Sequence, residues 1–201
     1  MKRLNITREV INKLLPYVEG RVLDLGAGSA KYKDILLKKA TDYVACDVQY
    51  NKNINVICDV ANLVFPAESF DTVISTQVLE HVKNPFIVVS EIKKVLKPGG
   101  HAIITVPFMI PYHPDPHDNF RFSKEGLETL VKSQNFEVVE SGIYGGIFMV
   151  FSAMIQFSWF NPYKHKSGRV MAFIEKIAKS LDKIFVTKTI YANSFIVAKK
   201  K

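Results

Sequence analysis

The segment at residues 22–32, VLDLGAGSAKY, constrains the fold of this chain more than any other feature of its sequence. Residues 22–25 place three apolar side chains around one acid, which is typical of a buried parallel strand. The glycines within residues 26–28 then predict a tight turn into a helix that begins near Ser29, because glycine lets other atoms approach the backbone closely. A strand, a glycine turn and a helix N-terminus together form a cradle for a nucleotide-like ligand.

Asp24 bears on which ligand this cradle can take. It lies two residues before Gly26, where its charge would repel a pyrophosphate and attract a cationic amine. The local pattern suits either a dinucleotide or S-adenosylmethionine, so features further along the chain have to distinguish between them.

Apolar runs alternate with amphipathic stretches along the chain, and this alternation predicts the α/β class. The predicted strands are residues 21–26, 42–47, 54–58, 70–75, 101–106, 136–140 and 192–198. The predicted helices are residues 7–18, 29–39, 84–97 and 124–134, with Ser123 as the last N-cap and a turn at residues 98–100 (PGG). Strands that alternate with helices imply a mostly parallel sheet covered on both faces. We expect residues 1–201 to form one domain, with a helical insertion at about 143–188 before the last strand.

Two further acids suit the recognition of an adenosine. Asp47 ends the second predicted strand, where its carboxylate can accept hydrogen bonds from both ribose hydroxyls. Asp59 follows the third predicted strand, where it can accept from the adenine amine while Val60 packs on the ring. Asp59 could instead cap a helix, since residues 61–63 (ANL) follow it.

With the segments FDTVISTQVLEHV and EIKKVLKPGGHAIITVP, the chain resembles class I S-adenosylmethionine-dependent methyltransferases, especially the type 11 family. The resemblance covers about residues 20–140 and the last predicted strand. It rests on the order of LDLGAGSA, CDV, the acid in CDVANLVFPAESFD, ISTQVLEHV and LKPGG. It implies a Rossmann-like, doubly wound, seven-stranded sheet with a reversed last strand. Where the family commonly has a third glycine this chain has Ala30, which we expect to be tolerated because alanine is small and favours helix.

The resemblance also implies which residues bind S-adenosylmethionine. Asp24 and Gly26 would contact its methionine portion, Asp47 its ribose, and Asp59 with Val60 its adenine. Residues just past the fourth predicted strand would line the sulfonium. The expected cofactor-binding set is Asp24, Gly26, Ala27, Gly28, Tyr32, Asp47, Val48, Asp59, Val60, Thr76 and Gln77.

The loop at residues 107–122, PFMIPYHPDPHDNFRF, follows the fifth predicted strand, at the edge where an acceptor should enter. We expect His113 or His117 to be a general base for methyl transfer to oxygen, because the pKa of histidine lies near neutral pH. Asp118 would orient an imidazole, and Arg121 would bind an anionic group. Alternatively, Asp118 and Arg121 pair while the histidines brace the loop.

We assign no metal ligand, because close spacing inside one loop is weak support for a metal site. His81, in LEHV, is expected to pack or cap locally.

The expected function is O-methylation of a small or lipid-linked acceptor. Residues 75–78 (STQV) stand where enzymes that methylate nucleic-acid amines often carry an Asn/Asp-Pro-Pro-aromatic motif, so a nucleic-acid acceptor is not expected. Two alternatives remain open. The chain could be an NAD-dependent oxidoreductase, or a methyltransferase-like subunit that binds the donor without catalysis.

The C-terminal part of the chain carries all of its net charge of +8. Residues 164–201 hold ten Lys or Arg and two acids, whereas the rest of the chain is neutral. Residues 143–160 are uncharged, and residues 169–185 form an amphipathic pattern with lysines on the polar face. This insertion could cap the active site, form a homodimer interface, or lie on an anionic membrane surface.

Cys46 and Cys58 are expected to be reduced, because two cysteines in a chain of this size rarely form a disulfide framework. The first predicted helix carries charges throughout and lacks the apolar core of a signal peptide. We therefore expect a cytoplasmic protein, either free or peripheral to the inner membrane face.

Overall fold

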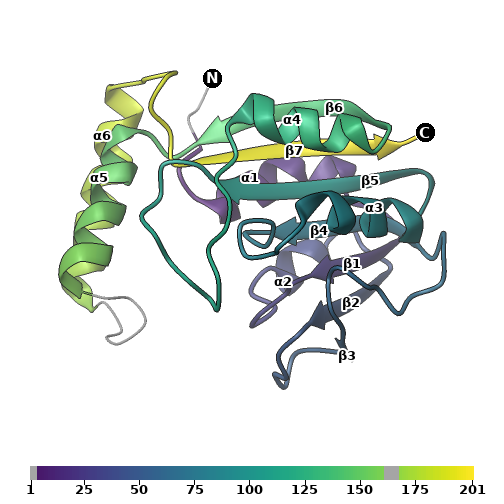
Figure 1. Ribbon diagram of the computed structural model, residues 1–201. Coiled ribbons are helices and arrows are strands. Elements are labelled where there is room, and N and C mark those ends of the chain that lie inside the picture. The colour runs from purple at the N-terminus through teal and green to yellow at the C-terminus, as the bar shows by residue number, and fades with distance from the viewer. Residues whose placement is uncertain (1–3, 161–167) are drawn as a thin grey trace.

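The computed structural model describes residues 4–160 and 168–201, and its centre is a seven-stranded sheet (Figure 1). The strands are β1 (Arg21–Leu25), β2 (Asp42–Asp47), β3 (Val56–Ile57), β4 (Phe70–Thr76), β5 (Leu96–Pro107), β6 (Phe136–Tyr144) and β7 (Asn193–Lys200). Their order across the sheet is β3-β2-β1-β4-β5-β7-β6. β7 runs antiparallel to both β5 and β6, whereas the pairs from β3 to β5 are parallel. This confirms the predicted Rossmann-like sheet with its reversed last strand.

Helices cover both faces of the sheet. They are α1 (Thr7–Leu14), continued by a 3₁₀ turn at Leu15–Tyr17, α2 (Lys33–Leu36), α3 (Pro85–Val95) and α4 (Lys124–Ser133). Successive residues of a strand point to opposite faces, so Leu23 packs in the cluster with α3 and α4 while Val22 packs in the cluster with α1 and α2. The predicted cap of α4 is observed, since the Ser123 hydroxyl accepts a hydrogen bond from the Gly126 N–H at 3.1 Å.

Two local predictions around glycine turns are wrong. The helix after the first turn begins at Lys33 and not near Ser29, because Ala30 has φ 54°, a left-handed conformation that no α-helix contains. The helix propensity of alanine therefore does not explain why Ala30 is tolerated at this position. Residues 98–100 lie inside β5 rather than in a turn, because β5 starts pairing with β4 directly after α3, at Leu96.

Cys46 and Cys58 form a disulfide, which corrects the expectation that both are reduced. The cause is the parallel pairing of β2 with β3, in which Cys46 lies opposite Val56. Cys58, two residues further on, is thereby brought to a Cα–Cα distance of 6.1 Å from Cys46, within the range that a disulfide spans. The two cysteines consequently give no argument for a reducing compartment.

The segment between β6 and β7 is helical. It contains α5 (Ile147–Ile155), a π-helical turn (Gln156–Phe160) and α6 (Arg169–Ile184). Figure 1 shows α5 and α6 side by side at one end of the sheet, apart from α1 to α4. Lys164 and Lys166, part of the basic segment predicted from sequence, lie outside the described residues. Among the residues that the structure describes, no helix combines the length and apolar character needed to cross a membrane.

The fully buried carboxylate of Asp182 joins α6 to the start of α5. Its oxygens accept hydrogen bonds from the backbone N–H groups of Gly146 at 2.8 Å, Phe148 at 3.1 Å and Met149 at 3.1 Å. These N–H groups belong to the first turn of α5, where no intrahelical acceptor is available and the helix dipole favours a negative charge. Asp182 is therefore an N-terminal cap supplied by a different helix.

We expect Asp182→Ala to loosen the α5–α6 pair, because three backbone donors lose their acceptor. A buried donor without a partner costs about 1–3 kcal/mol, so amide hydrogen exchange across residues 147–155 and 169–184 should accelerate by at least about 10-fold. Exchange in β1 to β5 should not change. Ser180→Ala, an exposed change on the same helix, is the matched control. Equal exchange rates in the two variants would contradict this role of Asp182.

Candidate functional site

The parallel register aligns the carboxyl ends of three central strands at one edge of the sheet. Asp24 in β1 pairs with Ala45 in β2 and Ile74 in β4, one or two residues before each strand ends. Each chain therefore leaves the sheet at the same edge. In open α/β sheets this edge is where ligands bind.

The glycine turn after β1 is tied to β2 and leaves one face open. The N–H groups of Gly26 and Ala27 both donate to the Cys46 carbonyl, at 2.9 and 3.0 Å, and the Gly28 N–H donates to Asp47 Oδ2 at 2.8 Å. Gly26 has φ 70°, and a Cβ there would lie 2.4 Å from a methyl carbon of Val78. A Cβ on Gly28 would meet nothing within 4 Å. The turn thus offers open space beside Gly28.

Asp24 is a buried acid that is only partly compensated. Its Oδ2 accepts a hydrogen bond from the Tyr43 hydroxyl at 2.7 Å, while its Oδ1 is buried without a partner among the described residues. Burial raises the pKa of Asp24 to about 6, and Tyr43 and Lys31 only partly offset this increase. A cationic donor bound at Oδ1 would satisfy the oxygen and offset the cost of burying its charge.

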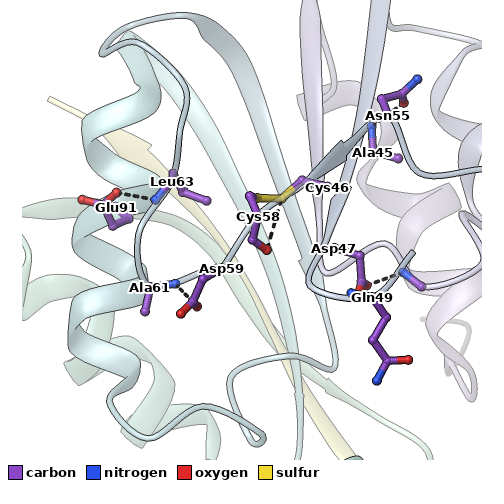
Figure 2. Close-up of a disulfide and its surroundings, with 11 residues drawn as sticks. Ala45, Cys46, Asp47, Gln49, Asn55, Cys58, Asp59, Ala61, Leu63 and Glu91 are labelled. Carbon is purple, nitrogen blue, oxygen red and sulfur yellow. Dashed lines mark hydrogen bonds between the residues drawn. A yellow bond between two sulfur atoms is a disulfide. The ribbon is translucent and has the colours of Figure 1, made fainter. Parts of the chain in front are cut away.

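The two acids assigned to adenosine each follow one cysteine of the disulfide (Figure 2). The Asp47 carboxylate accepts hydrogen bonds from two nearby backbone groups. Its Oδ2 accepts from the Gly28 N–H, and its Oδ1 accepts from the Gln49 N–H at 2.9 Å. Asp59 is exposed, and its Oδ1 accepts from the Ala61 N–H at 2.9 Å. That contact closes a turn and not a helix, so the helix-cap alternative for Asp59 is wrong.

The other predicted cofactor residues differ in exposure. Val48 is exposed, Val60 is half-buried against the core, and Tyr32 is buried at the start of α2. Gln77, with φ 57°, donates through Nε2 to the Thr105 hydroxyl and to the Tyr144 hydroxyl, both at 3.2 Å. Gln77 therefore links the end of β4 to β5 and β6, next to half-buried Thr76.

In the loop at residues 107–122, which we call the acceptor loop after its expected role, Asp118 pairs with Arg121 and contacts His113, not His117. Arg121 Nη2 lies 2.6 Å from Asp118 Oδ2, and the backbone N–H of His113 donates to the same oxygen at 2.8 Å. The Arg121 guanidinium holds the pKa of Asp118 at about 2. Arg121 also donates to the carbonyls of Ile110 and Pro111, at 3.2 Å each. The structure thus shows the expected alternative in which Asp118 and Arg121 pair with each other.

The acceptor loop meets the segment after β4 in a polar cluster of Glu80, His81 and His113. Glu80 is fully buried, and its Oε1 lies 3.7 Å from His81 Nε2 and 3.9 Å from His113 Nε2. Burial alone would lower the pKa of His113, but the Glu80 carboxylate and the Pro111 carbonyl raise it above its usual value. The His117 side chain is exposed, and its backbone carbonyl contacts His81 instead.

Sequence reasoning missed Glu80 entirely. The available signal was an acid beside a histidine in the otherwise apolar stretch QVLEHV, directly after a predicted strand. Among the described residues, Glu80, His81 and His113 are a group that could hold a metal ion, with ligand atoms within 4.8 Å of one another.

An apolar depression of about 480 Å³ lies between the acceptor loop and the helical insertion. Its lining residues are Met109, Ile110, Pro111, Val150, Met154 and Ser158. The His113 ring packs against Phe157, the residue before Ser158, with 5.8 Å between ring centroids. The polar cluster therefore borders an apolar surface built by both segments.

Comparison with known proteins indicates that this chain is similar to methyltransferases. Residues 23–104 match the family model described as a methyltransferase domain. A probable S-adenosylmethionine-dependent methyltransferase of Mycolicibacterium smegmatis is 26% identical over 68% of this chain and 60% of its own length. The ubiquinone biosynthesis O-methyltransferase of Xylella fastidiosa is 26% identical over 48% of this chain and 46% of its own length. The mouse probable tRNA methyltransferase 9B is 31% identical over 53% of this chain and 24% of its own length.

The fold comparison extends over almost the whole chain. The crystal structure of an S-adenosylmethionine-dependent methyltransferase from Mesorhizobium loti superposes with a TM-score of 0.64, 14% identity and 96% coverage of both chains. The chain spans less than two thirds of the length of each of the three curated relatives. At this identity the superposition shows a shared fold alone, and the match at residues 23–104 carries the family resemblance.

The raised pKa of Asp24 predicts a pH-dependent stability that Asp24→Asn abolishes. The folded-state pKa of about 6 exceeds the ordinary value of 3.8, so the folded state holds this proton more tightly. The stability contributed by the protonated form is fully present below pH 3.8 and is lost as pH rises through 6, by at most about 3 kcal/mol. In urea unfolding from pH 5 to 8, the wild type should lose stability relative to Asp24→Asn. The exposed change Asp34→Asn should keep the wild-type slope, and a slope shared by all three proteins would contradict the prediction.

Proposed function

We propose that this chain methylates a hydroxyl oxygen of a small or lipid-linked acceptor, with S-adenosylmethionine as the methyl donor. The proposal starts from the match of residues 23–104 to the methyltransferase domain of the class I, type 11 family. The observation that carries the choice of donor is the buried Oδ1 of Asp24 beside a glycine turn, which has no hydrogen-bond partner among the described residues. A pyrophosphate there would add negative charge next to a buried acid, whereas the ammonium group of S-adenosylmethionine would neutralise it.

The other predicted residues fit the same donor. Asp47 lies at the end of β2 beside the open space at Gly28, and each carboxylate oxygen can accept a further hydrogen bond from a ribose hydroxyl. Asp59 and the half-buried Val60 form the proposed adenine side. The link from the Leu63 N–H to Glu91 of α3, at 2.8 Å, holds this segment in place (Figure 2).

The acceptor is proposed to approach from the loop between β5 and α4. The apolar depression would take its hydrophobic part, and the polar cluster at His113 would take its hydroxyl group. Bound S-adenosylmethionine supplies an activated methyl group, so the chain mainly has to orient the acceptor oxygen. His113 or His117 is the proposed proton acceptor, while the Asp118–Arg121 pair fixes the loop. The net charge of +8 belongs to residues 164–201, whereas the rest of the chain is neutral, so we do not propose a nucleic-acid acceptor.

Donor binding is tested by calorimetry with S-adenosylhomocysteine and NAD in parallel. We expect S-adenosylhomocysteine to bind and NAD not to bind. Asp47→Asn should lower the affinity by about 10- to 100-fold, since a hydrogen bond to a charged group contributes about 1.5–3 kcal/mol. Asp42→Asn, at the opposite end of the same strand, is the matched control and should bind normally. NAD binding without S-adenosylhomocysteine binding would establish the oxidoreductase alternative instead.

We further propose that the helical insertion lies on an anionic membrane surface, which would present lipid-linked acceptors to the site. Val170, Phe173 and Ile177 of α6 are 44–63% exposed, and positions three or four apart lie on one face of a helix. The exposed Lys176 and Lys183 flank this face on the same helix. An apolar face bordered by lysines matches the chemistry of an anionic interface.

Flotation with anionic vesicles tests this placement. At low salt we expect the protein to co-float with anionic vesicles and not with neutral ones. Phe173→Ser should lower the partition coefficient by about 10-fold or more, because it removes about 1.5–3 kcal/mol of apolar burial. Phe86→Ser, which changes a phenylalanine of α3 that is 50% exposed against 63% for Phe173, should have no effect. Absence of co-flotation, or a dimer that Phe173→Ser dissociates, would overturn the membrane placement.

A further inference from the structure

We propose that Glu80, His81 and His113 bind a divalent transition-metal ion at the acceptor edge of the sheet. Glu80 and His81 follow β4, and His113 lies in the loop that follows β5. The adjacency of these two parallel strands brings the three side chains together, so their ligand atoms all lie within 4.8 Å of one another. Two imidazoles and one carboxylate are a ligand set that zinc and iron sites use.

Glu80 is the first observation that points to a cation. Its side chain is completely buried, and neither carboxylate oxygen accepts a hydrogen bond from the described residues. The two histidine nitrogens nearest to it, at 3.7 and 3.9 Å, are too far away to be hydrogen-bond donors. A buried carboxylate without donors is costly unless a positive charge compensates it.

The hydrogen bonds of the two histidines are the second observation. His81 Nδ1 lies 2.6 Å from the His117 carbonyl, and His113 Nδ1 lies 2.8 Å from the Pro111 carbonyl. A carbonyl oxygen can only accept, so Nδ1 of His81 carries the hydrogen. At His113 the Pro111 carbonyl at 2.8 Å favours the same tautomer over the longer 3.3 Å contact with Arg121 Nη2, in which Nδ1 would have to accept. In the neutral rings, both Nε2 atoms therefore keep a free lone pair on the side of Glu80. Metal-bound histidines are commonly oriented by such a bond from the other ring nitrogen.

The surroundings fit an ion that also contacts a substrate. The His81 and His113 side chains are 20% and 12% exposed, so both rings keep some contact with solvent while Glu80 is buried. Three protein ligands leave at least one coordination position free, as in catalytic rather than structural zinc sites. The positive charge of Arg121 is balanced by Asp118, so it does not compensate Glu80.

This role of the ion rests on the proposed methyl transfer. The acceptor hydroxyl would bind the free position, where the cation lowers the pKa of the hydroxyl and fixes its oxygen. The hydroxyl proton leaves to water, the oxygen forms a bond to the methyl carbon, and the carbon–sulfur bond breaks with its electron pair remaining on sulfur. His113 is then a ligand, so of the two histidines named as proton acceptors in the proposed function only His117, or solvent water, remains to take the proton.

The proposal is tested by titrating the chelator-treated full chain with Zn²⁺ alone in a calorimeter. We expect one ion per chain, and at least about 100-fold weaker binding for Glu80→Gln and for His113→Ala, because each removes a direct ligand. His117→Ala is the matched control, since it keeps the backbone carbonyl that His81 uses and changes only an exposed side chain. Co²⁺ absorption in the visible region gives a second readout, and its ligand-field bands should be lost in His113→Ala.

The outcomes separate this proposal from the proposed function. Circular dichroism shows whether Glu80→Gln folds, and His81→Asn replaces it if it does not. Zinc affinity equal to that of the wild type in folded His81→Asn and His113→Ala, or no zinc binding by the wild type, would overturn the metal site. Binding of S-adenosylhomocysteine to the metal-free protein should be unchanged, since Asp24 and Asp47 do not use the ion. Zinc binding at one ion per chain without donor binding would keep the metal site and remove the methyltransferase.

Discussion

The parallel register of β1 with β2 and β4 is the constraint on which the rest of the structure depends. It places the ends of three buried strands at one edge, so that the glycine turn, Asp47 and Gln77 leave the sheet together. The same register joins the turn to Asp47 through the Gly28 N–H. The next pair, β4 with β5, brings Glu80 to His113. The proposed donor side and the proposed acceptor side are therefore consequences of one ladder of backbone hydrogen bonds.

Three buried carboxylates differ in how far hydrogen bonds compensate their charge, and the two less compensated ones are those proposed to bind ligands. Asp182 accepts from three backbone N–H groups and holds the helical insertion together. Among the described residues, the Asp24 carboxylate accepts a hydrogen bond only from Tyr43, and the Glu80 carboxylate accepts none. Because an uncompensated buried charge is costly, the two under-compensated acids are the positions where binding of a cationic group gains most. They lie on the proposed donor side and the proposed acceptor side of the same edge.

The helical insertion links the acceptor site to the outer surface of the molecule. One side of α5 lines the apolar depression with Val150 and Met154, next to the loop that carries His113. The neighbouring α6 leaves Phe173 and Ile177 exposed to solvent. Asp182 joins these two helices through the three hydrogen bonds that it accepts at the start of α5. This arrangement suits an acceptor with a hydrophobic part.

The sequence by itself determined the strands, the glycine turn and the candidate donor acids, because apolar runs and glycines report local backbone preferences. It misplaced the start of α2, because the left-handed conformation of Ala30 is imposed by the packed turn and not by alanine. The disulfide, the Asp182 cap and the approach of Glu80 to His113 were decided only by tertiary structure. Each of these joins residues 12 or more apart, and the pairing of neighbouring strands or helices sets their distance.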